Sequence, residues 1–252
     1  MRIFAGPNGS GKSTVIDWVR KQTPKGHPID FGYYINADEI GKNLLKQPLD
    51  FKDFDIQCTP KEFAKVALSS GLINKEYTHE QFLNSYFLRG NRLHLKDKSK
   101  VDYLAQVTAD FLRKKMLELR KRFSFETVFS HVSKVDIMKE AVQLGYKVYL
   151  YFVSTSSPEI NKFRVLARVA KGGHDVNEDK IVSRYYRSMD LLYNAAQFAY
   201  QAFFFDNSRE GEHSVLFAHF KQQGGNKKWD SMNENEVPDW FIQYYSQKIS
   251  NQ

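Results

Sequence analysis

The stretch GPNGSGKST, residues 6–14, constrains this chain more than any other feature. It matches G-x-x-x-x-G-K-[ST], the pattern of a phosphate-binding P-loop. Its glycines let the backbone turn so that successive N–H groups converge on an anion. Lys12 adds positive charge for the β and γ phosphates of ATP, and the Ser13 hydroxyl is placed to bind Mg²⁺. The predicted ATP-binding residues are Gly6, Pro7, Asn8, Gly9, Ser10, Gly11, Lys12, Ser13 and Thr14.

The sequence on either side of this loop has the context that the motif requires. Residues 3–5 (IFA) form a short apolar run suited to a buried parallel strand, and residues 13–20 (STVIDWVR) have helical character. The start of the helix directs its dipole toward the same phosphates. Strand, loop and helix together predict a P-loop NTPase of the α/β class.

Apolar runs alternate with helical patterns along the rest of the chain, as expected for a parallel sheet covered by helices. The expected strands are residues 3–5, 33–35, 123–129, 147–153 and 202–205, with helices over 133–144 and 158–171. This pattern predicts a mostly parallel five-stranded sheet flanked by helices. Ligands bind such sheets at the carboxyl ends of the strands, so functional residues are expected just after them.

The length of 252 residues fits one large P-loop kinase domain over residues 1–252. Within it, residues 41–121 form a long insertion with helix-like pieces at 61–69 and 101–120, which predicts a helical subdomain. A last amphipathic helix is expected over residues 238–249.

The charge and cysteine content limit the partners and the compartment. The formal net charge is +8 and the pI about 9.3, which favours an anionic partner such as a nucleotide, a sugar nucleotide, a nucleic acid or an anionic membrane. Cys58 is the single cysteine, so no intramolecular disulfide forms. No signal-peptide pattern is present, and the longest apolar runs, such as 148–153, are too short to span a bilayer. We therefore expect a soluble cytoplasmic protein with no membrane partner.

The second expected strand ends in INADE, which places Asp38 at a strand end in the sheet of the P-loop. A carboxylate there can accept a proton from an attacking hydroxyl or help to bind Mg²⁺. Alternatively, Asn36 or Asp38 caps the helix that starts here. Capping by Asn36 would leave Asp38 free to act as the general base, and Asn36 is also a candidate substrate-binding residue.

The third expected strand ends in FETVF, where Glu126 and Thr127 interrupt an apolar run. A buried carboxylate is costly unless it is paired. Glu126 and Thr127 are therefore either structural, or placed to bind substrate hydroxyls near the phosphate.

Two helical segments joined by Gly172-Gly173 each carry a pair of arginines at helical spacing. We expect residues 164–187 to form a lid. Arginine forks suit phosphoryl oxygens and stabilise charge during transfer, although helix arginines are more often solvated or salt-bridged. Arg168 and Arg184 are the candidate catalytic residues, and Arg164 and Arg187 are candidates for binding substrate.

Two common P-loop classes lack their signatures in this sequence. The Asn-Lys pairs at 74–75 and 161–162 are not followed by the Asp of the guanine-specific Asn-Lys-x-Asp motif, and no LSGGQ segment is present. The fourth strand ends in Val153-Ser154-Thr155 without an acid, which weakens a purely hydrolytic ATPase interpretation.

The ordered motifs GPNGSGKST, INADEI, FETVFS, SPEINKFRVLARVAKGGHDV, KIVSRYYRS and FFFDNS resemble the zeta toxin family of P-loop kinases, over most of residues 1–210. The resemblance implies an ATP- and Mg²⁺-dependent kinase that phosphorylates the 3′-hydroxyl of the amino sugar in UDP-N-acetylglucosamine. It implies that Lys12 is the P-loop lysine, Ser13 the metal-binding hydroxyl and Asp38 the base. Glu126 and Thr127 match the substrate-side strand end. Such toxins are held inactive by a small antitoxin protein, which the resemblance adds as a partner.

Two alternatives remain beside the kinase. A nucleotide-dependent protein that binds nucleic acid or phosphorylates its ends fits the basic charge and the aromatic residues of the insertion (Tyr77, Phe82, Tyr86 and Phe87). A regulatory ATP-binding module, with the insertion as a docking surface, is the other.

Overall fold

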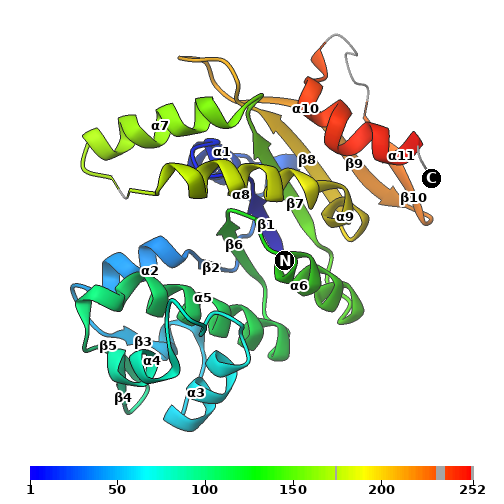
Figure 1. Cartoon of the computed structure of the whole chain (residues 1–252). Helices are drawn as coiled ribbons and strands as arrows, with labels where there is room; N and C mark the ends of the chain where they lie inside the picture. Colours follow the sequence, from blue (N-terminus) through cyan, green and yellow to red (C-terminus); the bar gives the residue numbers. More distant parts are fainter. Residues whose placement is uncertain (174, 231–235, 251–252) are drawn as a thin grey trace. The chain divides into compact units, whose positions relative to one another are not determined.

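The computed structural model describes residues 1–173, 175–230 and 236–250, and they divide into two compact units (Figure 1). Residues 1–31 and 126–252 form the first, here called the P-loop unit. Residues 32–125 form the second, here called the inserted unit.

The P-loop unit begins with β1 (Arg2–Ala5) and α1 (Lys12–Arg20), followed by the short turn η1 (Pro24–Gly26). The chain returns to this unit at residue 126. The elements that follow are α6 (Ser133–Gln143), β7 (Tyr149–Ser154), α7 (Pro158–Ala170), α8 (Glu178–Asp190), α9 (Leu192–Gln197) and β8 (Gln201–Asp206). Next are β9 (Val215–Gln223) and β10 (Asn226–Trp229). The chain ends in α10 (Asp239–Phe241), the π-helical turn η5 (Ile242–Ser246) and α11 (Gln247–Ser250).

Strand pairing in the P-loop unit explains where the loop lies. β1 pairs in parallel with β7, with Ala5 opposite Phe152, and β7 pairs in parallel with β8. The carboxyl ends of these three strands therefore lie at one edge of the sheet, as the sequence predicts. The core beside β8 is aromatic and includes Phe204, which contacts Phe241 and Tyr245 of the C-terminal helical segment.

The inserted unit begins with β2 (Tyr33–Ile35) and α2 (Ala37–Leu44) and ends with α5 (Val101–Glu118) and β6 (Phe123–Thr127), whose last two residues belong to the P-loop unit. β2 and β6 pair in parallel, with Tyr33 opposite Phe123. The other elements are β3 (Leu49–Asp50), η2 (Phe51–Phe54), α3 (Pro60–Leu68), α4 (His79–Ser85), β4 (Tyr86–Arg89), β5 (Arg92–Leu95) and η3 (Lys98–Lys100). Phe63 lies at the centre of this core, in ring contact with Phe51, Phe82 and Phe111.

The described residues form a mostly parallel α/β sheet of seven strands in the order β10-β9-β8-β7-β1-β6-β2, so the predicted number of five is wrong. All five predicted strands are present, and the two additional ones are β9 and β10. Both pair in antiparallel fashion, β10 at the edge of the sheet and β9 between β10 and β8. The β10 sequence NKKW is mostly polar, and the short apolar run VLFA that starts β9 lies within a polar, glycine-containing stretch, so neither was predicted as a strand.

The insertion also differs from the predicted helical subdomain. Its helices α3 and α5 form where helical patterns were read at 61–69 and 101–120. However, it also contains a three-stranded antiparallel sheet in the order β3-β5-β4. Those strands are only two to four residues long, which is too short to show a period along the sequence.

Candidate functional site

The P-loop has a backbone conformation that only glycine adopts readily. Gly6, Gly9 and Gly11 have φ angles of 142°, 74° and 93°. Gly11 is the N-cap residue of α1. A Cβ at Gly6 would lie 2.0 Å from the carbonyl oxygen of Val153, at the end of β7. The loop therefore packs directly against the carboxyl end of the neighbouring strand.

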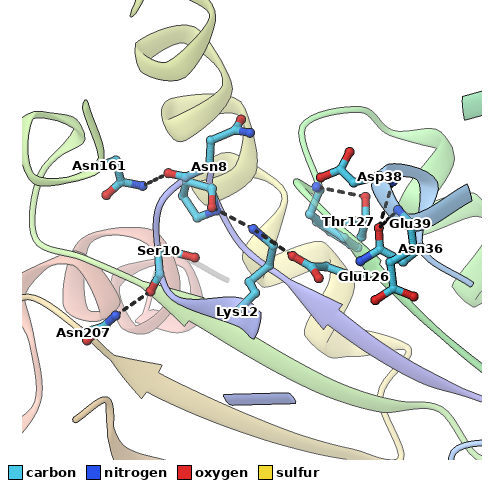
Figure 2. Close-up of polar contacts among 12 residues, drawn as sticks. Asn8, Ser10, Lys12, Asn36, Asp38, Glu39, Glu126, Thr127, Asn161 and Asn207 are labelled. Carbon is cyan, nitrogen blue, oxygen red and sulfur yellow. Dashed lines mark hydrogen bonds and ion pairs between the residues drawn. The ribbon is translucent and has the colours of Figure 1, made fainter. Parts of the chain in front are cut away.

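Lys12 lies at the start of α1, and its side chain is only 7% exposed. Its amine donates a hydrogen bond to the carbonyl oxygen of Pro7 at 2.9 Å and lies 3.8 Å from the Oε1 atom of Glu126 (Figure 2). Glu126 is therefore a paired carboxylate, as its structural interpretation requires. Its partner is the lysine of the P-loop itself. The ion pair holds the ammonium group in the loop, where a phosphate would meet it.

Two asparagine side chains support the loop from other elements of the P-loop unit, as Figure 2 shows. Asn161, fully buried on α7, donates from Nδ2 to the carbonyl oxygen of Asn8 and accepts from the hydroxyl of Thr155. Asn207, just after β8, donates from Nδ2 to the carbonyl oxygen of Ser10 at 2.9 Å. Neither asparagine was among the predicted functional residues. A polar residue directly after a buried strand was the available signal for Asn207.

The loop also contains polar atoms that have no protein partner. The Oγ of Ser10, which is fully buried, and the Oδ1 of Asn8 are both shielded from solvent without a hydrogen bond in the described part of the chain. Buried polar groups are normally paired, and exceptions often mark the place of an ion or ligand. Ser13, the predicted Mg²⁺ ligand, is exposed at the second position of α1.

Residues 164–187, the predicted lid, fall on α7, α8 and the segment between them, and the Asn177 side chain caps α8. His174 of the GGHDV motif lies outside the described residues. A Cβ at Gly173 would come within 2.5 Å of Arg168 Cγ, which explains the second glycine of the pair. Tyr185 of α8 donates to the carbonyl oxygen of Thr155 at 2.7 Å. Burial raises the pKa of Tyr185, so its hydroxyl keeps the proton that it donates and holds α8 against the end of β7.

The four lid arginines have different surroundings. Arg164 donates to the carbonyl oxygens of Asn207 at 2.7 Å and Arg209 at 3.1 Å, so it clamps the loop that supports Ser10. Arg187 donates to the carbonyl oxygen of Ser183 within its own helix at 3.2 Å. Arg168 lies in the last turn of α7, and Arg184 lies on α8. Their catalytic roles stay predictions.

Thr127, at the end of β6, accepts a hydrogen bond at its hydroxyl from the N–H of Phe129 at 3.2 Å. Phe129 has a φ angle of 60°, so the threonine stabilises a tight turn directly after Glu126. Contact with a substrate hydroxyl stays a prediction for both residues.

In the inserted unit, Asn36 caps α2: its side chain accepts from the N–H groups of Asp38 at 2.9 Å and Glu39 at 3.3 Å (Figure 2). The Asp38 carboxylate is not the helix cap. Of the aromatic residues considered for a nucleic-acid surface, Tyr77, Phe82 and Tyr86 are buried in the core, and only Phe87 is exposed.

The described residues contain no group of three or more His, Cys, Asp or Glu side chains placed to hold a metal ion. None of their helices is both long enough and apolar enough to cross a membrane.

Comparisons with known proteins show similarity of fold to solved structures but little similarity of sequence. No model of a known protein family matches the sequence. An uncharacterized protein of Haemophilus influenzae is 38% identical over 63 residues, which are 25% of this chain and 45% of that protein. The chain therefore spans less than half of the length of this curated relative.

Among solved structures, the chain is similar to one in the PezAT chromosomal toxin–antitoxin system of Streptococcus pneumoniae. The identity is 15%, the TM-score is 0.50, and the match covers 98% of this chain and 78% of that one. Two structures of the AvrRxo1-ORF1:-ORF2 complex also match, each at 16% identity. The native structure has a TM-score of 0.49, and the match covers 99% of this chain and 64% of that one. The structure with ATP has a TM-score of 0.47, and the match covers 93% of this chain and 61% of that one. The PezAT match confirms, at the level of fold, the predicted resemblance to P-loop kinases of the zeta toxin type.

Proposed function

We propose that this chain is an ATP- and Mg²⁺-dependent phosphotransferase that moves the γ-phosphate to a hydroxyl of a small-molecule acceptor. The observation that supports this most is the buried amine of Lys12, held at the glycine loop by the Pro7 carbonyl at 2.9 Å and by Glu126 at 3.8 Å. A lysine kept there as an ammonium ion supplies charge that matches the phosphates of a nucleotide.

The loop fits ATP with Mg²⁺ by its donors. The unpartnered Ser10 hydroxyl can donate a hydrogen bond to a phosphate oxygen, and the Ser13 hydroxyl is exposed at the start of α1. Mg²⁺ prefers oxygen ligands and is commonly shared between phosphates and one or two protein groups, so Ser13 is the protein group assigned to it here. Bound there, the ion neutralises phosphate charge during transfer.

In this proposal Lys12 and the lid residues Arg168 and Arg184 stabilise the charge on the transferring group. Asp38 accepts the proton of the attacking hydroxyl. The residues proposed to position the acceptor are Asn36, Glu126, Thr127, Arg164 and Arg187.

The acceptor that we propose is a sugar nucleotide such as UDP-N-acetylglucosamine, which the motif resemblance implies and the basic net charge of +8 suits. The PezAT structure is of a toxin–antitoxin system, which supports a small antitoxin protein as a partner of this chain.

The test uses purified full-length protein, Mg²⁺ and γ-labelled ATP, with UDP-N-acetylglucosamine, a nucleic-acid 5′-hydroxyl end, or no acceptor. Label should appear on the sugar nucleotide. Asp38→Asn should lower the rate roughly 10²- to 10⁴-fold while ATP still binds, because only the base is removed. Asp53→Asn, at an exposed carboxylate of the same unit, is the matched control and should retain full transfer.

Full transfer in Asp38→Asn would remove Asp38 as the base. Label on the 5′-hydroxyl end alone would replace the proposed acceptor with a nucleic acid. ATP binding without label on any acceptor would favour a regulatory ATP-binding module.

A further inference from the structure

One face of the β4–β5 hairpin in the inserted unit gathers positive charge. Arg89 pairs with Arg92 across the strands, and Phe87 pairs with His94. Because side chains alternate along a strand, these four residues share one face, while Leu88 and Leu93 take the other. Leu93 is fully buried, so the arginine face is the outer face of this small sheet.

Two arginines directly opposite each other are unfavourable unless their charge is compensated. Arg92 is compensated by Asp50 of the neighbouring strand β3, with 3.0 Å between Nε and Oδ2. Asp50 also accepts from the N–H of Lys52 at 3.0 Å, and these contacts lower its pKa. Within the described ranges, no carboxylate forms an ion pair with Arg89. Of the cationic side chains of Lys52, Arg89 and Arg92, only that of Arg92 forms an ion pair with Asp50 among the described residues.

These residues line a hollow of about 510 Å³, which is within the usual range for small-ligand sites. Its walls include Asp50, Lys52, Arg89, Asn91, Arg92 and His94. The cationic side chains outnumber the one carboxylate, so the net charge of the lining suits an anion.

The tip of the hairpin is fixed rather than loose. Asn91 donates from Nδ2 to the carbonyl oxygen of Ile56 at 2.8 Å and accepts from the N–H of Cys58 at 2.8 Å. Its own carbonyl accepts from the N–H of Phe51 at 3.1 Å. Gly90, with a φ angle of 60°, allows the two-residue turn. The arginines are therefore presented from a rigid support, which lowers the entropic cost of binding.

An aromatic surface adjoins the arginines. The rings of Phe87 and His94 stack with their centroids 4.5 Å apart and an angle of 10° between their planes. Phe87 is 44% exposed. Aromatic rings beside cationic groups are the combination that proteins use to bind nucleotide units, because the base stacks and the phosphate pairs.

We propose that this hairpin face is a second nucleotide site, separate from the P-loop. Lys52, Arg89 and Arg92 contact the phosphate, and the base stacks on the Phe87–His94 pair. The ligand is either a free nucleotide or a unit within a single strand. The proposal is independent of the kinase activity proposed above.

The experiment measures binding of fluorescent UMP and of a labelled short uridine oligonucleotide to the full chain by anisotropy. ATP is left out, because it would compete for a second nucleotide site as well, and the measurement is repeated with Lys12→Ala so that any binding at the P-loop is recognised by its loss. Affinity should fall as salt rises from about 50 to about 200 mM. Arg89→Glu should weaken binding at least about tenfold, and Phe87→Ala about fivefold or more, because stacking is lost.

Lys75→Glu is the matched control, since Lys75 is exposed in the same unit and the change in charge is the same. It should change affinity less than about twofold. A much tighter oligonucleotide would identify the ligand as a strand, and equal affinities would identify it as a free nucleotide. Failure of both probes to bind at low salt would overturn the proposal. Equal weakening by Arg89→Glu and Lys75→Glu would also overturn it, as it would show only general attraction to a basic surface.

Discussion

At the scale of single residues, the P-loop depends on contacts in which an added methyl group has no space. Gly6 combines a φ angle of 142° with a hypothetical Cβ only 2.0 Å from the Val153 carbonyl oxygen. Because that obstacle is backbone in a paired strand, a local adjustment would disturb β7 itself.

We therefore expect Gly6→Ala to abolish detectable ATP binding and to lower the free energy of unfolding by at least about 3 kcal/mol. Gly211→Ala is the control, because Gly211 also has a positive φ angle, 73°, but open space around it. It should cost only about 1–2 kcal/mol, the strain of the left-handed conformation. Urea denaturation and ATP titration check both variants, and equal losses would show that the close approach to Val153 is unimportant.

The motif alone located Lys12 and the three loop glycines, since their spacing is local. It could not locate Asn161 or Asn207, which are 153 and 197 residues away from the carbonyl groups that they support. Contacts of this kind depend on the fold that brings β8 and α7 to the loop, and the sequence near the loop does not predict them.

At the scale of elements, α7 acts as a support for the P-loop. Pro158 at its first turn and the buried Asn161 place one amide against Asn8, while Arg164 on the same helix holds the segment after β8. One helix thus fixes the loop by two routes, directly and through Asn207.

Asn161→Ala should leave the Asn8 carbonyl without its buried partner. We expect a loss of about 1–3 kcal/mol in the free energy of unfolding and roughly tenfold weaker ATP binding. Asn161→Asp should be no better, because a carboxylate cannot donate to a carbonyl oxygen. Isothermal titration with ATP measures the effect. Asn194→Ala, at an exposed position of α9, should match the unmodified protein, and wild-type affinity in Asn161→Ala would refute the support role.

Element prediction succeeded where periodicity and burial coincide and failed where they do not. The strand at 147–153 corresponds to β7, whose residues from Leu150 onward are buried, so an apolar run was an adequate signal. β9 begins with the apolar residues VLFA, but it is exposed at both ends and ends in the polar residues KQQ, so apolarity and burial do not coincide along it. Its place depends on pairing with β8, which includes a register shift at Phe204/Phe205.

At the scale of the whole molecule, the two units carry separate natural probes. Trp18, Trp229 and Trp240, the three tryptophans of the sequence, all belong to the P-loop unit, and Cys58, the single cysteine, belongs to the inserted unit. Burial, together with the charge of Glu62, raises the pKa of the Cys58 thiol to about 12. At pH 8 the folded protein therefore exposes almost no thiolate, and reaction with a thiol reagent reports unfolding of the inserted unit.

We expect two separate urea midpoints, one from tryptophan fluorescence and one from Cys58 labelling. ATP with Mg²⁺ at about 100 times its Kd should stabilise the P-loop unit by about 2.7 kcal/mol and shift only the tryptophan midpoint. Coincident midpoints that shift together would show that the units unfold as one.

The same thiol gives a pH dependence. Its pKa is higher in the folded state than the ordinary value of 9.0, so the folded state retains a proton that the unfolded state loses. The contribution of Cys58 to stability is therefore fully present below about pH 9 and is lost as pH rises toward 12. Cys58→Ser, measured in parallel, should lack this component.

The inserted unit begins and ends on neighbouring strands. Tyr33 lies opposite Phe123, and the Tyr33 N–H donates to the carbonyl oxygen of Arg122 at 3.0 Å, so the two ends of a long segment meet at about the 5 Å spacing of adjacent strands. A segment whose ends meet in this way can be replaced as a unit without moving the strands on either side of it. Recombination can exchange it in one piece, and with it whatever the segment recognises, while the glycine loop and its amide supports are inherited unchanged.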